Sequence, residues 1–440
     1  MKHYSKLSGK IKQQVTIFSN NVTAGEFTKP IRRAIREFIY GIQAEKDIKI
    51  ASVARSLNEQ IALIKVETRL SNNLNKEDYF EKLHDKIIQM ASKYIREDTV
   101  LAIDPGDVVK KYAKQMEYLY KVRDGSTGNI EPGYPLIHVA AADVSGEVMI
   151  PLLMKLYSSI APGFLSENKE ILDAIDFVVK RIGQKGIWTI DRGGDRKKII
   201  EHLLEKNLRF VIRLKGDRHL LAKQEGVDKW DKQDALAIAK QTKCRHYKWI
   251  KKKKEGEEIP KKVRVTIGAH EVIFPGCEGK PMTIIVVKGY SKTPMMLLTN
   301  VEANYAHDTS CLEKIVDIYL TRWKCDENYR FLKTSYNAED VRALKYIGIK
   351  NTFTLLLAVF YFLCVFLGFK TRLNLLVKEI CEKAQRFFEI PEYKWYALSD
   401  GVYKILSKTI KPFTAPSSRH PPSTQTILFP KDPYFYAEPL

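Results

Sequence analysis

The sequence predicts an α/β protein in which a mixed sheet is flanked by helices, interrupted by a mostly β insertion, and bordered by helical regions at both ends. Three patterns support this. Residues 1–98 carry apolar side chains at helical spacing, residues 99–215 alternate short apolar runs with amphipathic segments, and residues 216–292 hold several short β-branched stretches. With 440 residues, 45% of them hydrophobic, the chain is long enough for two or three domains and a large core.

The N-terminal region contains two short apolar-faced helices, at residues 49–57 and 61–74, separated by a polar break. This pattern resembles a helix-turn-helix, whose second helix enters the major groove of DNA. Arg69 and Asn73 on the second helix are therefore candidate DNA contacts. A small helical bundle with a solvated helix face is the alternative.

Strands are expected from residue 99 onward. The apolar run 100–104 ends in an aspartate, Asp104. Two further apolar runs, 135–143 and 147–154, flank a tight turn and predict an antiparallel hairpin. Ser166 is the expected N-cap of the amphipathic helix that follows.

Helices and strands then alternate. A strand at 187–191 ends in Asp191, and a helix at 196–206 and a strand at 208–213 come next. Three antiparallel strands followed by alternating helices and strands is the order of a ribonuclease-H-like sheet. After the insertion the sheet is expected to resume at 296–300.

One apolar segment, residues 353–369, approaches the length of a membrane span. It is at the short limit for a span, and Lys350, Lys370 and Arg372 flank it closely. We expect a buried core helix with no membrane partner; a membrane-associated basic protein is the alternative.

These changes of pattern define the predicted domains. They are a helical DNA-end-binding domain (1–98), a ribonuclease-H-like domain in two pieces (99–215 and 293–345), a β-rich insertion (216–292), and a C-terminal helical region and tail (346–440).

The charge of the chain indicates a polyanionic partner. Lys and Arg number 73 against 52 Asp and Glu, a formal net charge of +21. Nucleic acid is the first expectation and an anionic membrane surface the second. The six cysteines form no Cys-x-x-Cys pair and no zinc spacing. Together with an N-terminus that lacks an apolar signal core, they indicate a reducing cytosol.

The helix expected after Asp308 carries the most informative pattern. Four of its polar side chains fall within roughly 60° of one another at about 100° per residue: Tyr319, Arg322, Asp326 and Lys333. A core face should be apolar instead. The stripe suits a carboxylate that binds a metal beside cations that bind phosphate, with arginine as a bidentate fork and lysine as a point charge. A simple Arg–Asp salt bridge one turn apart is the alternative.

Three carboxylates can provide the protein ligands for two magnesium ions. Asp104 and Asp191 each follow a short apolar strand, so they should project at one edge of the sheet, and Asp326 comes from the helix. Mg²⁺ prefers oxygen ligands and keeps several waters. Two such ions about 3.5–4 Å apart stabilise the attacking and leaving oxygens of an in-line displacement.

Jointly these motifs resemble the DDE transposases of bacterial insertion sequences that carry a Tyr-x2-Arg-x3-Glu-x6-Lys signature. The likeness covers roughly residues 45–370 and includes the two strand-end motifs, Ile-Asp104 and Ile-Asp191-Arg-Gly-Gly. The third acid of that family is usually Glu, whereas this chain has Asp326 followed by Glu327. We expect Asp326 to serve, because Glu327 lies about 100° off the stripe; a one-residue adjustment of the helix would bring in Glu327 instead.

The resemblance implies a cut-and-paste DNA transposase that uses two Mg²⁺ ions, with Mn²⁺ able to substitute. It implies hydrolytic nicking of an element end, a hairpin intermediate and joining to target DNA. The implied partners are double-stranded DNA and a second copy of the chain, in the cytoplasm of a bacterium and associated with the nucleoid. Tyr319, Arg322 and Lys333 would contact phosphates, and Arg330 and Arg213 are further candidates. A nuclease that does not rejoin, or a DNA-binding protein that lost catalysis, are the alternatives.

Overall fold

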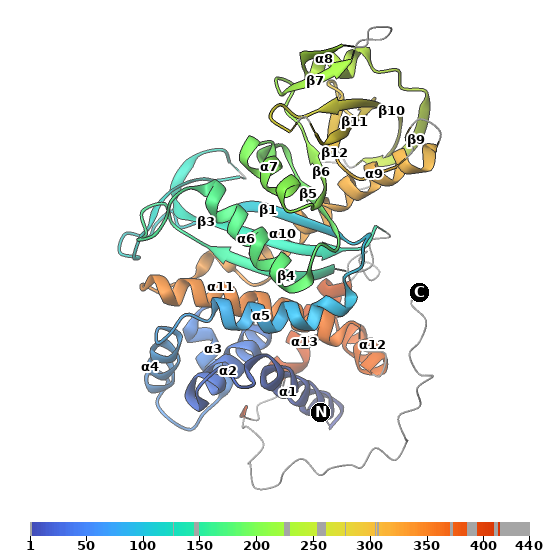
Figure 1. Cartoon of the computed structure of the whole chain (residues 1–440). Coiled ribbons are helices and arrows are strands. Elements are labelled where there is room, and N and C mark those ends of the chain that lie inside the picture. Colours follow the sequence, from blue (N-terminus) through green and yellow to red (C-terminus); the bar gives the residue numbers. More distant parts are fainter. Residues whose placement is uncertain are drawn as a thin grey trace.

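The computed structural model describes residues 2–125, 127–144, 149–223, 229–252, 261–277, 279–303, 305, 308–369, 373–384, 394–408 and 412–413. Figure 1 shows a β-rich lobe at the upper right, a sheet with covering helices in the middle, and a helical layer at the bottom. The chain is therefore a mixed α/β protein, as expected.

The strands of the described residues join in one sheet. They are β1 (Val100–Val109), β2 (Tyr120–Arg123), β3 (Ile130–Ala142), β4 (Met149–Leu156), β5 (Ile187–Ile190), β6 (Arg209–Arg213), β7 (His219–Lys223), β8 (Trp230–Asp234), β9 (His246–Lys252), β10 (Lys261–Ile273), β11 (Pro281–Lys288) and β12 (Met295–Thr299). The main path is β2-β3-β1-β5-β6-β12-β11-β10-β7-β8, with β4 paired to β3 and β9 to β10. The insertion is mostly β, as predicted, and its strands continue the central sheet through β12 and β11.

The helices come mainly from the two ends of the chain. They are α1 (Lys2–Thr23), α2 (Lys29–Glu45), α3 (Ile50–Leu57), α4 (Leu63–Leu74), α5 (Phe80–Ala91), α6 (Glu167–Ile182), α7 (Lys197–Glu205), α8 (Ala235–Gln241), α9 (Thr309–Thr321), α10 (Trp323–Ser335), α11 (Tyr346–Tyr361), α12 (Asn374–Lys383) and α13 (Lys394–Ser407). The expected N-cap Ser166 and the helix start expected after Asp308 are both confirmed. Ser166 accepts a hydrogen bond from the Lys169 amide at the start of α6, and Asp308 accepts one from the Ser310 amide at the start of α9.

The first strand is longer than predicted. β1 does not end at Asp104 but pairs antiparallel with β3 as far as Val109. Its parallel pairing with β5 spans only Val100 to Ala102. The later half of β1 is therefore an edge on that side, where the missing N–H of Pro105 breaks no ladder.

The two faces of the central sheet pack against different helices. Val100, Ile187 and Val211 form a core with apolar residues of α9. Trp188 and Phe210, which alternate with them, belong to the larger core that includes α6 and α7. This arrangement leaves the end of α9 and the start of α10 beside the ends of β1, β5 and β6.

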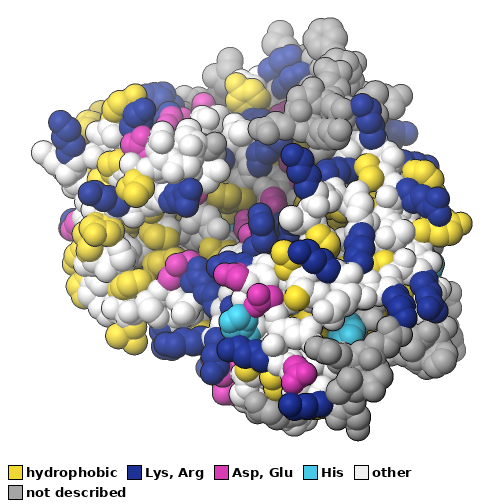
Figure 2. All heavy atoms as spheres, turned by 90° about the horizontal axis from the view of Figure 1, so that it is seen from above, with side chains coloured by type: hydrophobic (Ala, Val, Ile, Leu, Met, Phe, Trp, Pro, Cys, Tyr) yellow, Lys and Arg dark blue, Asp and Glu magenta, His cyan; other side chains and the backbone are white. Residues whose placement is uncertain are grey.

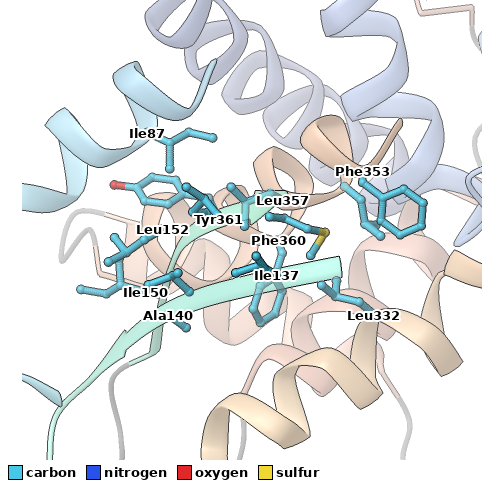
Figure 3. Packing of buried hydrophobic residues seen from close by; sticks show 14 of the residues in the cluster. Ile87, Ile137, Ala140, Ile150, Leu152, Leu332, Phe353, Leu357, Phe360 and Tyr361 are labelled. Carbon is cyan, nitrogen blue, oxygen red and sulfur yellow. The ribbon is translucent and has the colours of Figure 1, made fainter. Parts of the chain in front are cut away.

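The apolar segment forms a core helix, as predicted. α11 continues into a π-helical stretch, Phe362–Leu367. The helix is long and apolar enough to cross a membrane, but 94% of its most apolar window is buried inside the protein. Figure 3 shows Leu357 and Phe360 of α11 packed with side chains of β3, β4 and α10. Helices from both ends of the chain surround α11, so the regions 1–98 and 346–413 share one core.

Candidate functional site

Strand pairing places three predicted site residues near one another. In the parallel β1–β5 ladder the last pair is Ala102 and Thr189, two residues before Asp104 and Asp191. In the β5–β6 ladder the last pair is Ile190 and Ile212, one residue before Asp191 and Arg213. Two acids and one arginine thus lie at or just past the paired segments of three adjacent strands, and the charge of Asp191 acts on Asp104.

Arg322 joins the third acid to the first. It lies between α9 and α10, and its backbone keeps helical dihedrals. The Arg322 side chain is buried, and its Nη1 lies 2.7 Å from Asp326 Oδ1 and 3.9 Å from Asp104 Oδ1. One guanidinium group therefore joins the first and third acids, and both carboxylates converge on it.

Burial and the close spacing of charged groups shift the pKa values of the acids. Burial, followed by repulsion from Asp326 and Asp191, raises the pKa of Asp104 to about 7, although Arg322 opposes the shift. Burial also raises the pKa of Asp326, again against the attraction of Arg322. For Arg322 itself, burial lowers the pKa, but the neighbouring Asp326, Tyr319 and Asp104 raise it above the usual value overall. Carboxylates that are hard to ionise together are typical of functional sites.

The donor set fits a divalent cation in its chemistry, because carboxylate oxygens are the ligands that Mg²⁺ prefers. The three carboxylates, however, are not arranged around a common position for a metal ion. Among the described residues, no three His, Cys, Asp or Glu side chains are grouped closely enough to hold a metal ion. Asp326 is turned to Arg322, and Asp191 Oδ1 accepts a hydrogen bond from the Gly193 amide at 2.7 Å. The prediction that Asp104, Asp191 and Asp326 share a pair of metal ions stays a prediction.

The raised pKa of Asp104 predicts a pH-dependent change in stability. An acid whose pKa is raised by folding destabilises the folded state progressively as the pH rises from about 4 to about 7. Above that range the full destabilisation is present. Without metal, Asp104→Asn should therefore be more stable than wild type at pH 8, by roughly 1–3 kcal/mol. The gain should vanish near pH 4. Thermal unfolding in EDTA at both pH values measures this, and an equal or lower Tm at pH 8 contradicts it.

Helix α10 is fixed to β1 just beyond Asp104. The Tyr329 ring lies against Gly106, where an added Cβ would meet ring carbon Cε1 at 3.0 Å. The Tyr329 hydroxyl donates to the backbone carbonyl of Asp107. Lys333 Nζ lies 3.3 Å from Asp107 Oδ2 and 3.0 Å from Glu339 Oε1, so this predicted phosphate contact is paired with acids. Sequence reasoning missed Tyr329; a glycine two residues after the first acid is the signal that could have indicated it.

Glu327 points away from the other acids. Its Oε1 accepts a hydrogen bond of 2.6 Å from the hydroxyl of Tyr396 on α13, and its Oε2 lies 3.7 Å from Arg330 Nη1. Asp326 rather than Glu327 is the carboxylate turned toward Arg322 and Asp104, and the catalytic role of either acid stays a prediction. Arg330 has a 73% exposed side chain, so its DNA contact stays a prediction.

Tyr319 does not lie on an exposed stripe with the cations. It is 1% exposed and belongs to the core between the sheet and α9, with the Arg322 guanidinium 5.8 Å from its ring centre. The stripe is buried rather than exposed at this point: Tyr319 and Arg322 are both buried, and Arg322 keeps helical dihedrals between α9 and α10. The prediction of a phosphate contact from Tyr319 is therefore replaced by packing against Arg322.

The predicted DNA contacts on α4 are tied to protein groups. Arg69 donates to Glu37 through Nη1 and to Glu59 through Nη2, and the Glu37 side chain is only 4% exposed. Asn73 Nδ2 donates to the backbone carbonyl of Arg69 at 2.8 Å. The two helices form as predicted, but these side chains serve the structure. Ile64, 67% exposed, marks the free face of α4.

Arg69→Ala is therefore expected to reduce stability rather than DNA affinity. It leaves the buried Glu37 carboxylate with Arg33 alone, and should lower the free energy of unfolding by about 2 kcal/mol. Chemical denaturation measures the change. Lys65→Ala on the exposed side of the same helix is the control and should have little effect. A stable Arg69→Ala variant with weakened DNA binding would contradict this assignment.

Arg213 lies near Tyr290 beside the candidate site, and Tyr290 in turn lies near the exposed Trp323. Burial raises the pKa of Tyr290 to about 12, and the positive charge of Arg213 opposes that shift, which places the two side chains near each other. Trp323, at the start of α10, is 39% exposed, and its ring centre lies 6.1 Å from that of Tyr290. Figure 2 shows Lys and Arg side chains over much of the face seen from above, including its middle, where Asp and Glu lie beside them.

The comparisons with known proteins agree with this geometry in part. Residues 165–362, less than half of the chain, match the family model described as "Transposase DDE domain". The matched span contains Asp191 and Asp326, whereas Asp104 lies outside it. No curated protein matches the chain. A cryo-EM structure of a piggyBac transposase synaptic complex with hairpin DNA is similar at 11% identity, 93% coverage of this chain, 80% coverage of that chain and a TM-score of 0.43, a likeness too low to carry an inference.

Proposed function

We propose that this chain is a transposase that cuts the ends of a DNA element and joins them to target DNA. One observation carries the proposal: Asp104 on β1 and Asp326 on α10 converge on Arg322, and the charge of Asp191 acts on both carboxylates. The match of residues 165–362 to the transposase DDE domain supports this reading. The net charge of +21 suits a DNA partner.

The central sheet supports a ribonuclease-H-like arrangement. Its strands follow the order β4-β3-β1-β5-β6. The first three are antiparallel, and β1, β5 and β6 are parallel to one another. In this order the first two acids come just after the segment where β1 and β5 pair: Asp104 within β1 and Asp191 directly after β5.

Asp104, Asp191 and Asp326 would hold two divalent ions, Mg²⁺ or in its place Mn²⁺. When bound, such ions supply Lewis acidity toward the phosphate oxygens and a nucleophile at neutral pH. The chain must first release Asp326 from Arg322, because that carboxylate is now bonded to the guanidinium. Once released, the Arg322 fork can bind two oxygens of the reacting phosphate.

The protein's own residues then position the DNA. Arg322 binds the reacting phosphate, and Arg213, level with Asp191 across the strands, binds a neighbouring one. Lys333 and Arg330 on α10 contact the backbone further along. In the first step a water oxygen attacks phosphorus, the P–O3′ bond breaks, and the leaving oxygen takes up a proton as a 3′-hydroxyl. That hydroxyl then attacks a phosphodiester of the opposite strand: the new P–O bond closes a hairpin on the element end, and the P–O3′ bond that breaks leaves a 3′-hydroxyl on the flanking DNA. Hydrolysis reopens the hairpin, and the regenerated 3′-hydroxyl attacks a target phosphodiester, whose 3′-oxygen leaves, in a complex of two copies.

A second reading, a DNA-binding protein without catalysis, is favoured by one observation. No three metal-ligating side chains stand together among the described residues. A cleavage assay separates the two readings. The substrate is a supercoiled plasmid that carries the gene with its native flanking DNA, incubated with the protein and MgCl₂ or MnCl₂, with EDTA as the control.

Site-specific nicks at the flanks, hairpin ends on a denaturing gel and joined products support the proposal. Nicks without joined products indicate a nuclease. Retarded migration of the flanking DNA without any strand cleavage in either metal supports the DNA-binding reading and overturns the proposal.

A further inference from the structure

A buried polar contact joins the sheet to α10 beside the candidate site. The Asn328 amide Nδ2 donates to His138 Nε2 at 3.3 Å. His138 is 1% exposed and Asn328 is fully buried. Burial lowers the pKa of His138 to about 4, so the ring is neutral near pH 7 and its nitrogen can accept this bond.

The contact lies between the strand of the first acid and the helix of the third. His138 is directly opposite Asp104 in the β1–β3 ladder, and such cross-strand neighbours lie on the same face. Asn328 follows Asp326 by two residues on α10. The β3–β4 register shifts between Val139 and Ala140, and such irregularities often re-aim side chains next to functional sites.

Other polar atoms of the His138–Asn328 pair lack hydrogen-bond partners among the described residues. His138 Nδ1 and Asn328 Oδ1 are buried and make no hydrogen bond to the described residues. Unpaired buried polar atoms are unfavourable, so apolar side chains of the same shape would serve stability better. His84 provides a contrast: it is equally buried, its Nδ1 lies 2.7 Å from the Phe80 carbonyl, and its Nε2 accepts from the Met154 amide at 3.1 Å. The His138–Asn328 contact therefore orients helix α10 on the sheet and adds little to the stability of the fold.

We propose that His138 and Asn328 are positioning residues that set where α10 presents Asp326 to Asp104. This inference rests on the proposed function. Tyr329 fixes the height of α10 over Gly106, and the His138–Asn328 bond fixes its rotation on β3. Neither residue touches DNA or the reacting atoms; both act through the carboxylate that α10 carries.

Two conservative replacements of the same histidine test the inference. His138→Gln keeps an acceptor near the position of Nε2, whereas His138→Asn places it near Nδ1, out of reach of Asn328. The Mn²⁺ concentration that gives half of the maximal thermal shift should rise at least about tenfold in His138→Asn and stay within about threefold of wild type in His138→Gln. Asn328→Leu should match His138→Asn, and combining the two should add little, because both remove one bond.

A metal-free measurement adds a second readout. Hydrogen exchange across residues 323–335 should be faster in His138→Asn than in His138→Gln. The control is His84→Gln, which should lose stability but keep the wild-type Mn²⁺ response. The inference is overturned if His138→Asn and His138→Gln respond alike, or if His84→Gln shifts the Mn²⁺ response as much as His138→Asn. A wild-type protein whose Mn²⁺ response equals that of Asp104→Asn points instead to failure of the proposed function.

Discussion

Replacing Asp104 or Asp191 by asparagine should reduce cleavage of the element end at least about a thousandfold, a loss of ~4 kcal/mol of transition-state stabilisation. Asparagine keeps the shape of each side chain but removes the negative charge that a divalent ion requires. Binding of the end should change by no more than about twofold, since phosphate contacts supply most of that affinity. Single-turnover cleavage and gel-shift titration at fixed salt measure the two effects.

Glu327→Gln provides the matched control for these variants. Its carboxylate bonds to Tyr396 rather than facing the other acids, and glutamine can still accept that hydrogen bond. It should cleave at nearly the wild-type rate. Unimpaired cleavage by Asp104→Asn or Asp191→Asn would remove that residue from the metal site.

Arg322→Ala should lower the cleavage rate about a hundredfold or more, the size expected when a group that stabilises developing charge is removed. The variant loses the guanidinium that lies between Asp104 and Asp326, and it also loses the fork that binds phosphate. Arg322→Lys keeps the charge without the planar fork, so it should recover only part of the rate. Cleavage rates at several salt concentrations measure both variants.

Arg330→Ala is the control for Arg322→Ala, because it removes an exposed arginine from the same helix. It should leave the cleavage rate nearly unchanged and reduce only the salt dependence of end binding. Wild-type cleavage by Arg322→Ala would show that this arginine acts on neither the acids nor the phosphate.

Local patterns in the sequence predicted the parts of the site that depend on neighbouring residues. Short apolar runs before Asp104 and Asp191 predicted two strands, which pair in parallel up to two residues before the acids. The N-caps Ser166 and Asp308 marked two helix starts. Angular spacing favoured Asp326 over Glu327, in agreement with where the two carboxylates point.

Long-range contacts explain what could not be predicted. The spacing from Tyr319 to Lys333 predicted one polar stripe, and only the packing of α9 on the sheet shows that Tyr319 and Arg322 are buried. Arg69 looked free on its own helix, but its partner Glu37 lies on α2. The apolar run 100–104 suggested a strand that ends at Asp104, while pairing with β3 extends β1 to Val109.

A crystal soaked in Mn²⁺ tests the central claim most directly, because anomalous scattering locates the ion without assuming its ligands. The account predicts a peak bound by carboxylate oxygens of Asp104, Asp191 and Asp326, with Asp326 released from Arg322. A peak bound through Glu327, or no peak near Asp104 and Asp191 at a Mn²⁺ concentration that supports cleavage, would contradict it.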